Sequence, residues 1–265
     1  AKPAPERLIE GNVLRLEQRG GEPAWVKFRS IPGGEHVHDV ANFDGALWAV
    51  GSGSDHRGEW ESGRIFRYLW RSEDGGASFA TAHRVMYPDL SKGDTRFRQL
   101  LPIGDTLHVF GYVNPFVDGG PLEGRHVTVR GGVIRDLEGP FARQVVDRAW
   151  PLSATLGLLV TREAEGTPSR AFAVDPRGIR ELPGLDALRV IDVTPGGRPG
   201  EVLVLTAGRE DPATHTIHRI AFDALDRPQP VLELPGVAAA SIAVWRGDLY
   251  IGTEDGRVLR STRTR

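Results

Sequence analysis

Apolar and polar residues alternate along most of this chain in short runs. The clearest runs cover residues 13–16, 25–28, 36–43, 47–50 and 64–70. A period of two sends successive side chains to opposite faces, which predicts half-buried β-strands. Pairs such as Asp44-Gly45 and Arg246-Gly247 separate the runs and predict tight turns. No stretch predicts a helix, so the pattern predicts an all-β chain.

The predicted strands recur in groups. The segment Phe43-x-Gly45-x-Leu47-x-x-x-Gly51 aligns without a gap with Ile103-x-Asp105-x-Leu107-x-x-x-Gly111. A second match joins Glu61–Arg67 to Glu254–Arg260, whose starts are 193 residues apart. That separation is four intervals of roughly 48 residues, which is typical of the blades of a β-propeller.

The groups predict a five-bladed β-propeller. The chain stops inside the third strand of its fifth group, and the unassigned strand near Trp25–Ser30 is the natural donor of the missing fourth strand. Pairing of the N- and C-terminal strands would close the ring and remove exposed sheet edges. Six blades are the alternative if the hairpin at 13–28 forms its own blade, and a β-sandwich ranks third. Residues 1–10 read as a linker and 11–265 as one propeller domain.

One turn carries a family resemblance. Ser72-x-Asp74-x-Gly76-x-x-Phe79 resembles the Asp-box, the hairpin of bacterial neuraminidase-type (BNR) repeats in sialidase-like propellers. The aspartate accepts backbone N–H groups across the turn, and glycines adopt the positive φ that the turn requires. The resemblance implies a peripheral, structural role for these four residues, with the phenylalanine ring buried between sheets.

Composition excludes several classes of protein. The 33 Lys and Arg residues nearly balance the 35 Asp and Glu residues. The run of arginines at 257–265 is interpreted as a solvated last strand, so nucleic acid is not an expected partner. Cysteine is absent, which excludes disulfides and thiolate metal sites. No apolar run has the roughly 18 residues of a membrane span. The Pro-rich start at 1–5 suits a secreted, periplasmic or surface-tethered protein whose signal has been removed.

Long connections predict a decorated face. In a propeller the connections between second and third strands share one face with those between blades, and the long ones here are 51–63, 113–125 and 208–214, plus the inter-blade loop 87–96. We expect a glycan or a partner protein to bind there. The candidate binding residues are Asp55, His56, Arg57, Glu59, Trp60, Asn114, Phe116, Asp118, Glu210 and Asp211.

The innermost strands would line a central channel. His36 and His38 are two residues apart on a predicted inner strand, so their imidazoles point to one face and Asp39 to the other. Arg98 and Asp192 are further channel candidates. Two imidazoles can ligate a metal ion if other blades supply more ligands, and Asp192 is one candidate. The alternative is that these polar side chains bind water only, and no other cofactor is expected.

The resemblance also raises an enzyme hypothesis. Sialidases hold their substrate's carboxylate with three arginines and use a Tyr–Glu pair and an acidic Asp on the channel face. The tyrosines here, Tyr68, Tyr87, Tyr112 and Tyr250, all lie off the predicted innermost strands, and the chain has one clean Asp-box. These departures favour an exported, non-enzymatic propeller that recognises a glycan or a partner protein. A sialidase-like or other glycoside hydrolase is the alternative, and the oligomeric state stays open.

Overall fold

A computed structural model of the chain describes residues 10–53, 65–87, 93–115, 122–137, 141, 144–162, 169–209, 211 and 213–261. Its contacts divide the chain into two compact units, Ala1–Ala149 and Trp150–Arg265, which are described separately. Antiparallel strands dominate the described residues, which include one 3-10 turn, η1 (Pro183–Leu185). Across these residues no helix is both long and apolar enough to cross a membrane. A single domain over 11–265 stays a prediction.

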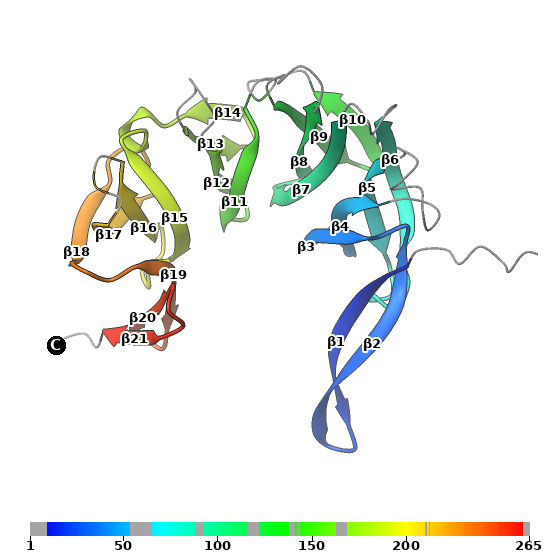
Figure 1. The fold of residues 1–265 in the computed structure, drawn as a ribbon, viewed down its shortest axis with the longest axis horizontal. Helices are drawn as coiled ribbons and strands as arrows, with labels where there is room; N and C mark the ends of the chain where they lie inside the picture. Colours follow the sequence, from blue (N-terminus) through cyan, green and yellow to red (C-terminus); the bar gives the residue numbers. More distant parts are fainter. Residues whose placement is uncertain are drawn as a thin grey trace, which may run out of the picture. The chain divides into compact units, whose positions relative to one another are not determined.

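The first unit contains a hairpin sheet and two four-stranded sheets, and its hairpin extends beyond its neighbours (dark blue in Figure 1). The hairpin consists of β1 (Glu10–Arg19) and β2 (Glu22–Pro32). The next sheet contains, in order, β3 (His36–Phe43), β4 (Ala46–Gly53), β5 (Ile65–Ser72) and β6 (Ala80–Tyr87). The third contains β7 (Gly93–Ile103), β8 (Thr106–Pro115), β9 (Glu123–Arg130) and β10 (Val133–Leu137).

Three further sheets follow, and their first strand, β11, crosses the boundary between the units. The first of these sheets contains β11 (Val146–Ser153), β12 (Leu156–Thr161), β13 (Ala171–Asp175) and β14 (Gly178–Glu181). The second contains β15 (Leu188–Pro195), β16 (Glu201–Gly208), β17 (His215–Ala221) and β18 (Gln229–Leu234). The last contains only three strands, β19 (Ala239–Trp245), β20 (Asp248–Thr253) and β21 (Val258–Ser261).

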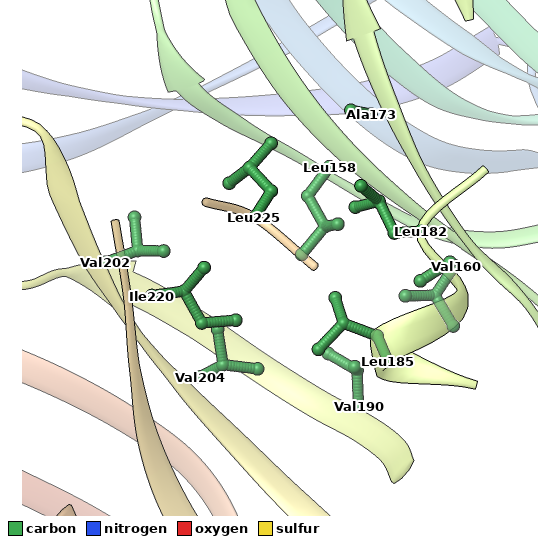
Figure 2. Packing of buried hydrophobic residues seen from close by; sticks show 11 residues of the cluster. Leu158, Val160, Ala173, Leu182, Leu185, Val190, Val202, Val204, Ile220 and Leu225 are labelled. Atoms are coloured by element: carbon green, nitrogen blue, oxygen red, sulfur yellow. The ribbon is translucent and has the colours of Figure 1, made fainter. Parts of the chain in front are cut away.

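Apolar clusters between neighbouring sheets hold each unit together. In the second unit Leu158 of β12 and Val190 of β15 belong to one such cluster, whose side chains converge from two sheets in Figure 2. In the first unit Val50 of β4 and Phe97 of β7 belong to another. Each fully buried aliphatic or aromatic side chain contributes about 1.5–3 kcal/mol. The alternation read from the sequence therefore supplies apolar faces to both sides of a sheet.

The N-terminal hairpin packs on the other face of the β3–β6 sheet. Ile31 of β2 joins Trp70 and Phe79 in a buried cluster, and the indole of Trp70 donates a hydrogen bond to the Pro32 carbonyl at 2.9 Å. The distal half is less covered, with Trp25 69% exposed and Leu14 and Leu16 also exposed. The hairpin is anchored at its base and presents an apolar stripe further out.

Two sequence-based boundaries change in the structure. β4 continues to Gly53 and β8 to Pro115, so both long connections start later than expected. The described strands form six sheets, of which β1–β2 is separate, and β21 pairs only with β20. The predicted pairing of the terminal strands is therefore not present among the described residues.

Candidate functional site

Four basic side chains gather near the starts of two neighbouring first strands. His36 and His38 lie on β3, and Arg96 and Arg98 lie on β7; we call these four the basic cluster. The two imidazoles are stacked, with ring centroids 6.2 Å apart and planes 14° apart. Burial and, to a smaller extent, the nearby Arg98, Arg96 and His36 together lower the pKa of His38 to about 4. His38 is therefore a neutral imidazole at pH 7 beside permanently charged guanidinium groups.

A β-bulge shapes each of these two strands. The register shifts between Val37 and Asp39 on β3, and between Phe97 and Gln99 on β7, so His38 and Arg98 are the extra residues. An extra residue bends a strand and redirects its side chains. Two bulges at corresponding places thus bring an imidazole and a guanidinium group to the same end of neighbouring sheets.

Glycines on the second strands make room for both bulges. A Cβ atom on Gly51 would lie 1.8 Å from the His36 carbonyl oxygen, and one on Gly111 would lie 2.1 Å from the Arg96 carbonyl oxygen. Gly51 pairs with Val37 and Gly111 with Phe97, directly before each bulge. The glycines that aligned in the sequence repeat therefore support the site-bearing strands.

The basic cluster contains hydrogen-bonding atoms without partners. His38 Nε2 and Arg98 Nε are both buried, and neither has a hydrogen-bond partner in the part of the chain that the structure describes. An arginine Nε can only donate, and a buried donor left unpaired costs about 1–3 kcal/mol, more when it is charged. Charged nitrogen donors suit an oxyanion such as a carboxylate or a sulfate.

The metal hypothesis for His36 and His38 stays a prediction without a complete ligand set. Among the described residues, no three His, Cys, Asp or Glu side chains are placed to hold a metal ion. The neighbouring guanidinium groups would repel a cation, since like charges at short range are destabilising. The cluster is thus better suited to an anion than to a metal ion.

Asp39 and Asp192 tie neighbouring first strands together. Asp39 Oδ2 accepts the Leu100 N–H of β7 at 2.8 Å, and Asp192 Oδ2 accepts the Ile242 N–H of β19 at 2.8 Å. Each second oxygen accepts the N–H of the next residue. Burial raises the pKa of Asp39, while the hydrogen bonds from Leu100 and Val40 oppose that rise. Asp192 therefore has a structural use within the second unit.

Asp39 also corrects the expected geometry of β3. Strict alternation placed its side chain on the face opposite to the histidines. The bulge at His38 shifts the register, so the Asp39 side chain lies on the same face of the sheet as His36 and bonds to β7. Arg67 contacts β7 from this face as well, through its hydrogen bond to Thr95. A bulge is not visible in a hydrophobic pattern, so this change could not be predicted from the sequence.

Most predicted loop residues lie outside the described part of the chain. These are Asp55, His56, Arg57, Glu59, Trp60, Phe116, Asp118 and Glu210. Asn114 is half-buried on β8, opposite Asp94. Asp211 accepts hydrogen bonds from the Thr214 hydroxyl and the Ala213 N–H, and these bonds lower its pKa. Asp211 thus organises its own turn.

The turn at residues 72–79 is held by its own side chains. Asp74 accepts the hydroxyl groups of Ser72 and Ser78 and the Ser78 N–H, bonds that hold its pKa well below the usual range. Gly76 has φ of 90° and donates its N–H to Ser72 Oγ. Phe79 is buried against the hairpin cluster. These contacts are structural and lie apart from the basic cluster.

Sequence reasoning missed two residues beside this site, Ser52 and Arg67. Both are buried in the ladder between β4 and β5 and face each other directly. Ser52 falls within the long connection that the sequence predicts over residues 51–63. The sequence feature that could have indicated this site is the charged Arg67 within an otherwise apolar run. An arginine is almost never fully buried unless it is paired.

The comparisons with known proteins establish the fold. No family model and no curated protein matches the chain. Among solved structures, a subtype N10 neuraminidase-like protein of A/little yellow-shouldered bat/Guatemala/060/2010 is similar with a TM-score of 0.53, 9% identity and coverage of 91% of this chain and 88% of its own.

Two further solved structures are similar. A chain of the nidogen/laminin complex has a TM-score of 0.52, 12% identity and coverage of 96% of this chain and 86% of its own. The β-propeller domain of the Trilobed protease from Pyrococcus furiosus, described as having an open velcro topology, has a TM-score of 0.51, 9% identity and coverage of 90% and 67%. At these identities the likeness concerns architecture alone, and the chain has a fold of the β-propeller type.

Proposed function

We propose that this chain is an exported, non-enzymatic β-propeller that recognises an acidic glycan beside the basic cluster of its first unit. The observation that supports this most is the pair of buried, unbonded nitrogens on His38 and Arg98. They lie near the strand ends from which the long connections 54–64 and 88–92 depart. A carboxylate or sulfate group on a sugar would supply the missing acceptors.

The chemistry of the described residues favours binding over hydrolysis. Most glycoside hydrolases need two carboxyl groups roughly 5–10 Å apart. Next to the basic cluster the described residues include the carboxyl groups of Glu35 and Asp39, and both oxygens of Asp39 already accept backbone N–H groups. A glycoside hydrolase remains the alternative function, and a partner protein with an acidic surface is a third outcome that the experiment separates.

A panel of acidic and neutral polysaccharides, scored for binding and for turnover, tests the proposal. We expect polygalacturonate or heparin to bind, neutral pullulan not to bind, and added salt to weaken binding. Arg98→Ala should weaken binding about tenfold, since a charge-assisted hydrogen bond contributes about 1.5–3 kcal/mol. Arg177→Ala removes an equal charge from a side chain that is 90% exposed in the second unit and serves as the control.

Each outcome of the panel has a distinct meaning. Turnover that survives purification would support the hydrolase alternative and overturn the binding proposal. Absence of both binding and turnover would turn attention to an acidic protein partner. Equal weakening by Arg98→Ala and Arg177→Ala would show that attraction is nonspecific and that the basic cluster is not the site.

We further propose that the propeller has five blades, to which the N-terminal hairpin adds no blade of its own. The hairpin packs through Ile31 on the face of the β3–β6 sheet that a preceding blade would cover, and the β19–β21 sheet lacks a fourth strand. Two strands alone rarely form a stable blade. Counting the hairpin as its own blade gives the six-bladed alternative.

A further inference from the structure

A row of three polar side chains crosses the β3–β6 sheet beside the basic cluster. His36 of β3 pairs with Ser52 of β4, and Ser52 pairs with Arg67 of β5. Directly opposed residues lie on the same face with Cβ atoms about 4.5–5.5 Å apart. We call His36, Ser52 and Arg67 the polar row. It lies one residue pair from the end of the β4–β5 ladder, at Gly53 and Phe66.

Arg67 is a buried cation to which no carboxylate of the described residues bonds. Its side chain spans to β7, where Nη1 donates to Thr95 Oγ1 at 2.9 Å and the guanidinium group lies over the Phe97 ring at 5.3 Å from its centroid. Thr95 in turn donates to the Tyr112 carbonyl at 3.0 Å. Arg67 is 6% exposed, and its Nε has no hydrogen-bond partner.

The electrostatics around Arg67 are unfavourable in the absence of an anion. Burial lowers its pKa to about 10, and the partial compensation by Asp136 is opposed by Arg125. Neither residue bonds to it in the described structure. An isolated buried charge costs several kcal/mol in real proteins, so a site of this kind is stabilised when an anion enters.

Ser52, the neighbour of Arg67 in the polar row, also has a buried polar atom without a hydrogen-bond partner among the described residues. It is fully buried and its Oγ has no partner. His36 at the inner end of the row is exposed, so the row runs from a solvent-facing imidazole to a buried guanidinium group. Its buried hydroxyl and guanidinium groups can both donate to one acceptor group.

We propose that the polar row binds one oxyanion, the carboxylate or sulfate group of an acidic sugar, with Arg67 Nε and Ser52 Oγ as its buried donors. This inference rests on the proposed function and assigns its anchoring group. The basic cluster on β3 and β7 attracts the anionic ligand, and the polar row fixes one oxyanion of it in a dehydrated place. Charge-assisted hydrogen bonds are strongest in such places.

Small probes test the row directly. Binding to wild type is measured by titration calorimetry and by the shift of the unfolding midpoint, with sodium galacturonate against galactose, and sodium sulfate against sodium chloride at equal ionic strength. We expect one of the two anions to bind and to stabilise the fold in a saturable way. Galacturonate alone would identify a carboxylate ligand, and sulfate alone a sulfated one.

Variants separate a ligand-binding role from a structural one. Arg67→Met should weaken anion binding at least tenfold yet leave the probe-free protein as stable as wild type or more so, because an apolar side chain replaces an unpaired buried charge. Ser52→Ala should weaken anion binding severalfold. If Arg67→Met fails to fold, Ser52→Ala tests the ligand-binding role of the polar row. Arg130→Met, at a side chain that is 70% exposed, is the control.

The contradicting results are specific. Equal anion responses in wild type, Arg67→Met and Ser52→Ala would overturn the polar row, as would no response of wild type to either anion. Polysaccharide binding that persists in Arg67→Met would overturn the row and leave the proposed function standing. If Arg67→Met loses small-anion binding and the wild type binds no polysaccharide, the polar row is supported and the glycan ligand of the proposed function is contradicted.

Discussion

Lowering the pH from 7 to 5 is expected to reduce the free energy of unfolding by about 4 kcal/mol, through two histidines of the β7–β10 sheet. His108 Nδ1 and His126 Nε2 lie 3.0 Å apart, so one imidazole donates to the other. The His126 ring stacks on Phe110 with centroids 4.6 Å apart, and Phe141 covers it edge-on. This shared hydrogen bond needs one nitrogen without a proton.

The direction of the effect follows from the pKa values. Burial lowers the pKa of His108 to about 4; burial and the neighbouring His108 lower that of His126 to about 3. An unfolded histidine has a pKa of about 6.5, so between these limits the unfolded chain binds more protons. The stabilising contribution is complete above about pH 6.5 and is lost progressively as the pH falls toward 4 and 3. At pH 5 each imidazole accounts for about 2 kcal/mol.

Urea unfolding at several pH values measures this dependence. The double variant His108→Gln/His126→Gln cannot take up these protons and should show a flatter profile between pH 7 and 5, even if its stability at pH 7 is lower. His38, whose pKa is also lowered to about 4, should leave a residual slope in that variant. Equal profiles for wild type and the double variant would contradict the assignment to this pair.

Gly51→Ala is expected to destabilise the first unit by about 3 kcal/mol, at the upper end for an overpacked site. The added methyl group would meet the His36 carbonyl oxygen at 1.8 Å and the Trp70 ring at 3.0 Å. Backbone oxygen cannot rotate away, so either the bulge at His38 or the β3–β4 ladder must shift. Because His36 and His38 lie at this bulge, the substitution should also weaken anion binding.

A matched glycine provides the control for this prediction. Gly252 also lies on the second strand of its sheet, but its added Cβ would meet only the side-chain oxygen of Ser241, at 2.4 Å. A rotating hydroxyl can move, so Gly252→Ala should cost clearly less. Chemical denaturation of both variants measures the difference. A loss for Gly51→Ala that does not exceed the loss for Gly252→Ala would show that the inner strand tolerates the methyl group.

Much of the fold could be predicted because strand formation is local. β3 and β10 occupy the predicted residues 36–43 and 133–137. The turn at Asp74 follows from short-range hydrogen bonds that its own residues make. Strand ends were harder to predict. Gly51 and Gly53 are typical of loops, but both lie on β4, where close backbone contacts leave no room for a side chain.

The all-β class, the strand repeat and the polar character of β3 could be predicted, because side-chain alternation and turn chemistry depend on neighbours along the chain. The paired bulges at His38 and Arg98, and the burial of Ser52 and Arg67, became visible in the folded chain alone. The unbonded state of these atoms depends on register and on which sheets face each other. Contacts between residues far apart in the chain leave no periodic trace in a single sequence.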